Sequence, residues 1–179
     1  MRNSLYILGQ LDDGDVEWII AHGAKRALEP GEILITQGRH VDAMSIVLEG
    51  MLTVEVDSRQ IAQRGPGEIL GEMSFVDGSP PSATVRASER SVLLSIPRAA
   101  VSAHLQLDTA FAARFYRSIA MVLSARIRER LGDSGTAAEE SDFPGLGPGI
   151  DDDVLANVHL AGARCAHLLR RLDDPSPGA

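Results

Sequence analysis

The chain is poor in cysteine and in aromatic residues. Cys165 is the single cysteine among 179 residues, and aromatic residues make up 4% of the chain. A lone cysteine excludes an internal disulfide framework and a CxxC metal site, and it fits a reducing compartment. Because hydrophobic residues still reach 44%, we expect a folded core built of aliphatic side chains.

Long apolar runs are also absent. The opening residues, MRNSLYILGQLDD, contain no apolar segment of the length found in a signal peptide. No stretch approaches the roughly 18–20 apolar residues that a membrane-spanning helix needs. We therefore expect a soluble, cytoplasmic protein that makes no membrane contact.

Positive charge is scarce at the C-terminal end. Residues 1–131 carry 14 Lys and Arg against 16 Asp and Glu, whereas residues 132–179 carry 3 against 9. Contacts to nucleic-acid phosphates need clustered positive charge. We expect no nucleic acid among the partners of this protein.

The first two thirds of the chain predict a short helix followed by strands. Asp12 and Asp13 can cap a helix that ends near Gly23. Short segments rich in β-branched residues follow, separated by glycine, proline and aspartate turns, as in a small antiparallel sandwich or barrel. These predicted strands are residues 33–36, 44–50, 51–56, 59–64 and 91–96.

The pattern becomes helical after Pro97. Proline is tolerated in the first turn of a helix, so residues 97–107 are predicted as one helix. Asp108 then caps a longer helix that ends at Gly132. Its apolar residues recur at steps of four, four and three and form one stripe, which consists of Phe111, Phe115, Ile119 and Val122.

Three roles are open for this stripe. It can cover a ligand pocket as a lid, pack against a second copy in a dimer, or pack on the protein's own strands. We expect a dimer, because an apolar stripe on a helix leaving the domain needs a cover. The residues that would face a ligand if the helix is a lid are Arg117, Ser118, Met121 and Ser124. The other face carries arginines that we expect to be solvated or to contact the acidic linker: Arg114, Arg117, Arg126, Arg128 and Arg130.

The remaining residues divide into three parts. Residues 132–150 are rich in Gly, Pro, Ser and acidic residues, which predicts a linker. Residues 151–172 predict an amphipathic helix from about residue 154, and residues 173–179 a frayed tail. The helix can fold back on the domain, pair with a dimer mate or dock on another protein. We expect it to fold back or to exchange between copies.

The stretch GEMSFVDGSPPSATV, residues 71–85, predicts a ligand site. Gly71 lets the backbone approach a ligand closely, and the carboxylate of Glu72 follows at the start of a short helical turn. The structural alternative is that Glu72 only caps this turn.

Two segments, residues 28–56 and 65–85, resemble the cyclic-nucleotide-binding domains of the catabolite activator protein and of protein kinase A regulatory subunits. The resemblance covers residues 5–131 and implies an α+β fold: an antiparallel β-roll (jelly-roll) with an N-terminal helix and a C-terminal helix pair, here followed by a separate C-terminal helix. It also implies that Glu72 accepts a hydrogen bond from a ribose hydroxyl, and that Ser82 and the Ala83 N–H donate to a phosphate.

The chain departs from this family at Pro81, which stands where the family has its phosphate-binding arginine. Proline has neither a cation nor an N–H, and losing a buried charge contact costs about 2–5 kcal/mol. Arg39, Arg64 and Arg86 are candidate replacements. The pocket then binds a cyclic nucleotide weakly, binds a nucleoside-like ligand without a phosphate, or stays empty.

We therefore expect domain 1–131 to be a non-catalytic sensor that passes its ligand state to an unknown protein partner through the long helix. A homodimer is expected, and the alternative function is a ligand-free scaffold for oligomerisation or docking. The sequence has no catalytic serine, P-loop or Cys/His metal motif, and we expect no enzyme activity, metal or cofactor. The predicted ligand-binding residues are Gly71, Glu72, Met73, Ser74, Pro81, Ser82 and Ala83.

Overall fold

The structure is a computed structural model, and it describes residues 5–132, 160, 163–164 and 166–172. The helices are α1 (Leu5–Gln10), α2 (Asp13–His22), α3 (Glu72–Asp77), α4 (Arg98–Leu107) and α5 (Thr109–Gly132). The strands are β1 (Ala24–Leu28), β2 (Ile33–Ile35), β3 (Ala43–Glu49), β4 (Leu52–Val56), β5 (Arg59–Arg64), β6 (Ile69–Leu70), β7 (Thr84–Ala87) and β8 (Ser91–Pro97).

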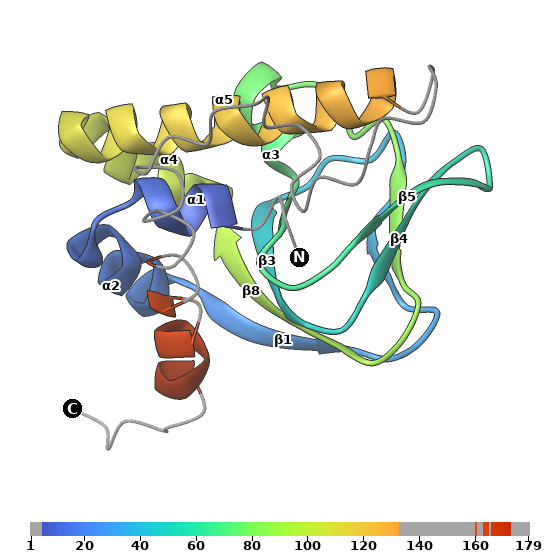
Figure 1. The fold of residues 1–179 in the computed structure, drawn as a ribbon, viewed down its shortest axis with the longest axis horizontal. Helices are drawn as coiled ribbons and strands as arrows, with labels where there is room; N and C mark the ends of the chain where they lie inside the picture. Colours follow the sequence, from blue (N-terminus) through green and yellow to red (C-terminus); the bar gives the residue numbers. More distant parts are fainter. Residues whose placement is uncertain (1–4, 133–159, 161–162, 165, 173–179) are drawn as a thin grey trace.

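The strands form an antiparallel β-roll of two four-stranded sheets. One sheet has the order β1-β8-β3-β6 and the other has the order β2-β7-β4-β5. The helices gather at one end of the roll, and α5 crosses its top (Figure 1). This arrangement confirms the predicted α+β roll with flanking helices.

All five predicted strands are present, and three further strands were not predicted. Strand β1 exposes four of its five residues, so it shows no apolar alternation that would reveal a strand. Strand β6 has only two residues. Strand β7 follows the proline-containing loop of the predicted ligand site, and its apolar residues are too few to predict a strand alone. Helix α1, with six residues, was also not predicted.

The predicted helices begin where their caps indicate. The side chain of Asp12 accepts a hydrogen bond from the backbone N–H of Asp15 at 2.9 Å, and the side chain of Asp15 accepts one from the backbone N–H of Asp12 at 2.8 Å. Asp108 caps α5 by accepting from the Phe111 N–H at 2.8 Å. Such reciprocal and single caps satisfy donors that the first helical turn leaves unpaired.

The apolar stripe of α5 lies inside the protein's own core. Phe111, Phe115, Ile119 and Val122 are all buried, together with apolar residues of α1, α2, β3 and β8. The stripe therefore already has its cover, and it is neither a lid nor a free dimer surface. The argument for a dimer from an uncovered stripe was wrong, and a homodimer stays a prediction.

Helices α2 and α5 are joined by the buried carboxylate of Asp15. Arg114 donates to its two oxygens from Nε at 2.6 Å and from Nη2 at 2.8 Å. Burial alone would raise the pKa of Asp15, but hydrogen bonds from Arg114 and from the Asp12 N–H outweigh it and lower the pKa below its ordinary 3.8. The same bond raises the pKa of Arg114. Arg114 is thus an inter-helix contact and not a solvated residue.

The C-terminal residues fold back on the domain, as one of the predicted alternatives required. The described residues 160, 163–164 and 166–172 are helical, and they lie beside α2 (Figure 1). Leu168 is completely buried in the core shared by α1, α2 and α5. The predicted linker 132–150, apart from Gly132 at the end of α5, lies outside the described residues, as do residues 151–159 and the tail 173–179.

Candidate functional site

A cavity of about 460 Å³ lies between α3, the following loop, the interior of the β-roll and the second half of α5. Its apolar wall comes from Ile35, Val54, Leu70, Val85 and Leu123. The structure brings all seven predicted site residues to this cavity: Gly71, Glu72, Met73, Ser74, Pro81, Ser82 and Ala83. Whether they bind a ligand stays a prediction.

Gly71 starts α3 in a conformation that suits glycine. Its φ is +84°, and a Cβ added there would lie 3.1 Å from the Ala43 carbonyl oxygen. Gly78 ends the same helix at φ +72°. These two glycines confine α3 to six residues, and the close approach to Ala43 holds its first residue, Glu72, against the roll.

Glu72 is buried, with 2% of its surface exposed, and it pairs with Arg126 of α5. Nη1 of Arg126 donates to Oε1 of Glu72, and Nη2 donates to the Ile69 carbonyl oxygen at 2.7 Å. The Nε atom of Arg126 is buried without a hydrogen-bond partner among the described residues. An unsatisfied buried donor costs about 1–3 kcal/mol, so this guanidinium can take a further acceptor.

Arg126 is the pocket residue that sequence reasoning missed. We assigned it to the solvated face of the helix, and the structure places it in the cavity wall with 14% of its side chain exposed. A signal was present, because Arg126 follows Val122 by four residues and so continues the apolar stripe. A charged residue in line with buried positions is expected to have a buried partner.

The alternative lid residues are not in the cavity. Ser118 is buried and donates to the Phe115 carbonyl oxygen at 2.6 Å, and Arg117 is exposed. Neither residue lines the cavity, and neither do Met121 and Ser124. The helix instead faces the cavity with Leu123, Arg126 and Ile127.

The loop around Pro81 is held by the turn after β2. The Gly38 N–H donates to the Pro81 carbonyl oxygen at 2.8 Å, and the Gln37 N–H donates to Oγ1 of Thr84 at 3.1 Å. Pro80 and Pro81 both line the cavity but have no N–H to offer. Donors from this loop must therefore come from residues other than the prolines, such as Ser79, Ser82 and Ala83.

The three candidate replacement arginines have different positions. Arg64 lines the cavity and lies 3.5 Å from Glu68. Arg86 instead donates to the Gly31 carbonyl oxygen at 2.7 Å and lies 3.8 Å from Glu55, outside the cavity. Arg39 is exposed and does not line the cavity. Among the described residues, the cations at this site are thus Arg64 and Arg126.

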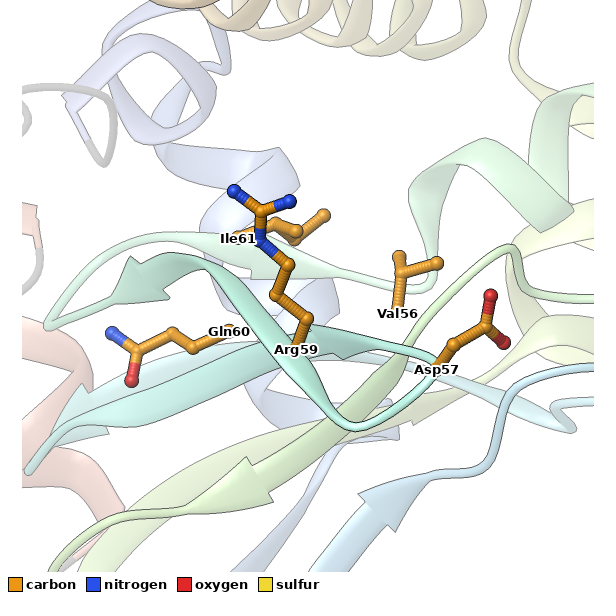
Figure 2. Close-up of a pocket in the computed structure, with 5 residues that line it drawn as sticks. All are labelled: Val56, Asp57, Arg59, Gln60 and Ile61. Atoms are coloured by element: carbon orange, nitrogen blue, oxygen red, sulfur yellow. The ribbon is translucent and has the colours of Figure 1, made fainter.

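A second hollow lies at the hairpin of β4 and β5 and has no comparable chemistry. Figure 2 shows its lining residues, with the long side chain of Arg59 standing away from the strands. The turn Asp57–Ser58 has positive φ at both residues, as a tight two-residue hairpin requires, and Gln37 donates to Asp57 at 3.2 Å. We assign this hollow to the shape of the hairpin.

Two further features of the described residues bear on function. They contain no group of three His, Cys, Asp or Glu side chains that could hold a metal ion. No described helix is long and apolar enough to cross a membrane.

Comparison with known proteins identifies the domain. Residues 25–108 match the family model described as cyclic nucleotide-binding domain. This segment of the chain is a cyclic nucleotide-binding domain. The matched segment contains α3 and the Pro81 loop, and it ends before α5 and Arg126.

The curated relatives that match are longer than the matched segment. The chain is 30% identical over 93 residues to a cAMP-dependent protein kinase regulatory subunit of Yarrowia lipolytica, covering 52% of this chain and 25% of the relative. It is 30% identical over 115 residues to the Pycsar effector protein XpPycTIR of Xanthomonas perforans, covering 64% of this chain and 37% of the relative. The chain thus matches only a quarter to somewhat over a third of these relatives.

Solved structures share the fold. A cyclic nucleotide-binding domain from Methylobacillus flagellatus superposes with a TM-score of 0.67 at 25% identity, over 76% of this chain and 84% of that one. The regulatory domain of Toxoplasma gondii PKA with cAMP superposes with a TM-score of 0.51 at 25% identity, over 55% of this chain and 39% of that one. The domain is therefore homologous to regulatory modules of kinases, and also of ion channels.

Proposed function

We propose that this protein is a non-catalytic sensor in which a small ligand occupies the cavity at Glu72 and its presence is passed through α5 to a partner protein. The observation that carries the proposal is the contact of Arg126 with Glu72. It joins the long helix directly to the residue that the family resemblance assigns to the ligand. A displacement of the Glu72 side chain therefore alters a contact of α5.

The cavity suits a ligand of nucleotide size. Its volume of about 460 Å³ lies within the about 300–1,000 Å³ of small-molecule sites, which are mostly apolar with a few polar groups. A carboxylate has about four acceptor positions, so Glu72 can accept a ribose hydroxyl as well as Arg126. We propose a cyclic nucleotide as the ligand, with Arg126 and Arg64 supplying positive charge that Pro81 lacks.

The mechanism follows from shared use of Glu72. A ligand hydroxyl that donates to Glu72 changes the position or the occupancy of the Arg126 contact. The second half of α5 then takes a different equilibrium position, by as much as the ligand prefers one arrangement over the other. A protein partner bound to α5 would read this shift.

The alternative function is a ligand-free scaffold that uses the same fold for oligomerisation or docking. Two observations favour the scaffold. Glu72 is already paired with Arg126, and the loop has Pro81 where the family has a cation. A homodimer is proposed under both functions. Its surface would be the exposed apolar residues on α3 and α5, Met73, Val76 and Ile127, since the stripe of α5 is buried.

Thermal unfolding tests the proposal. The wild-type chain, Glu72→Gln and the control Glu49→Gln, whose side chain is exposed, are unfolded with cyclic AMP, GMP, CMP and UMP and with the matching nucleosides. At 100 times its dissociation constant a ligand stabilises by about 2.7 kcal/mol, which is several degrees for a domain of this size. We expect a shift that Glu72→Gln removes and Glu49→Gln keeps. No shift with any compound would reject the sensor and favour the scaffold.

A further inference from the structure

The C-terminal helix has a contact surface of its own on α1 and α2. Arg164 lies in the angle between the two helices. Its Nη1 donates to the Leu8 carbonyl oxygen at 2.8 Å and also to the Leu11 carbonyl oxygen. From Nη2 and Nε it donates to Oδ1 of Asp13 at 2.8 and 3.0 Å.

These acceptors explain why the residue is an arginine. The last carbonyls of a helix have no partner within that helix. Leu8 lies in the last turn of α1, and Leu11 directly follows the helix. A cation is favoured at a helix C-terminus by the helix dipole. The planar guanidinium reaches two carbonyls and one carboxylate at once, and its side chain is almost covered, with 12% exposed.

An apolar contact and a charged rim complete the surface. Leu168, one turn after Arg164, is fully buried, and Leu169 and Leu172 pack beside it. At the rim, Nε2 of His167 lies 2.6 Å from Glu17, and Arg171 lies 3.4 Å from it. The helix is thus held by the hydrogen bonds of Arg164, by the buried Leu168 and by exposed contacts to Glu17, and exposed charged contacts contribute little each.

We propose that this face of α1 and α2 is a docking site for an amphipathic helix, that its occupant is residues 160–172 of the same chain, and that this helix is exchangeable. In this proposal the chain itself holds the helix near its site at a high effective concentration, so the contact can open without loss of the helix. A helix presenting arginine and leucine four residues apart on one face, as Arg164 and Leu168 do, would replace it in trans.

Displacement of the C-terminal helix would also affect the packing of the long helix α5. Helix α1 packs against α5, and Leu8 and Leu11 share the core with its stripe. Release of the C-terminal helix therefore removes support from the α1–α5 contact, by a route that does not involve the cavity. The proposed docking site does not depend on ligand binding in the cavity, so it can be tested separately from the proposed sensor function.

A peptide-binding experiment with the full chain tests the docking site. A fluorescent synthetic peptide of residues 154–172 is titrated, with anisotropy as the readout, against the wild-type chain and the variants Leu168→Asp and Arg164→Gln. In both variants the contact of the chain's own C-terminal helix with α1 and α2 is weakened. The peptide should bind both variants at least 10-fold more tightly than wild type, where the site is occupied. A peptide carrying Arg164→Gln should bind at least 10-fold more weakly than one carrying Arg170→Gln, an exposed residue.

Hydrogen exchange gives the second measurement. Amides of α1 and α2 should lose protection in both chain variants and regain it when saturating peptide is added. Equal peptide affinity for wild type and the variants, or binding to none of them, would overturn the proposal. Equal affinity of the two altered peptides would also overturn it, since the hydrogen bonds of Arg164 would then have no role in docking.

Discussion

Arg126 of α5 and Glu72 of α3 form a buried ion pair at the wall of the cavity, although 54 residues separate them in the chain. The pair links the short helix of the predicted ligand site to the long helix. A carboxylate buried as deeply as Glu72 needs a partner, because removing a charge from water is costly. The partner comes from a different element, and only the folded chain supplies it.

Breaking this pair should destabilise the domain. Arg126→Gln leaves the charge of Glu72 buried and uncompensated, and we expect a loss of about 3 kcal/mol in the free energy of unfolding. The double variant with Glu72→Gln should recover part of that loss, because the isolated charge is gone. Urea unfolding of wild type, the two single variants and the double variant gives the coupling energy between Glu72 and Arg126.

The matched control is Arg117→Gln on the same helix, where the side chain is exposed. Its unfolding free energy should stay within about 0.5 kcal/mol of wild type. If Arg126→Gln behaves like this control, the pair does not hold α5 to the cavity, and the proposed route from ligand to helix fails.

Asp15→Asn should weaken the contact between α2 and α5 in a pH-dependent way. The variant loses charged hydrogen bonds from Arg114, and we expect a loss of about 2–3 kcal/mol at pH 7. The pKa of Asp15 is lower in the folded chain than its ordinary 3.8, so its contribution is complete above about pH 5 and disappears as the pH falls through the folded-state pKa.

Urea unfolding at pH 7 and at pH 3 checks this sign. The difference between wild type and Asp15→Asn should shrink at pH 3, while the exposed Asp42→Asn should show almost no difference at either pH. A difference that grows on acidification would contradict the assigned role of Arg114.

The loss of stability in three glycine-to-alanine variants should depend on the space around each glycine. All three have positive φ, so each loses about 1 kcal/mol from backbone strain alone. At Gly78 nothing else lies within 4 Å, at Gly71 the new Cβ meets the Ala43 oxygen at 3.1 Å, and at Gly50 it meets the Arg90 oxygen at 2.6 Å. Destabilisation in urea should increase in the order Gly78, Gly71, Gly50, and any other order would contradict the packing described.

The single tryptophan should report on the junction of α2 and α4. Trp18 stacks on His104 with ring centroids 4.1 Å apart and an angle of 5° between the planes. His104→Ala should cost about 1 kcal/mol in stability and shift Trp18 emission to longer wavelength, because the ring loses its cover. The exposed His40→Ala is the control, and an unchanged emission spectrum in His104→Ala would contradict the stacking.

Much of the site could be predicted because it is local. Gly71, Glu72 and the Pro81 loop lie within one short stretch, so glycine conformation, a following carboxylate and the resemblance to a family were enough to bring all seven residues together. The caps of α2 and α5 were predictable for the same reason, since a cap joins residues three positions apart. Strand β1 is mostly exposed and strand β6 has two residues, so neither shows the alternation of apolar and polar residues that predicts a strand.

The sequence by itself determined five strands and the helices α2, α4 and α5, because these depend on turn residues, caps and apolar periodicity that act over a few positions. The resemblance to a family supplied the β-roll and the place of the ligand site. The tertiary structure alone decided the partners of the charged residues: Arg126 for Glu72, Arg114 for Asp15 and Arg164 for the end of α1. An arginine reaches a partner in any element that packs nearby, and its low-dielectric surroundings exist only after folding. That is why Arg114 and Arg126 were predicted to be solvated, whereas the structure pairs them with the buried carboxylates of Asp15 and Glu72.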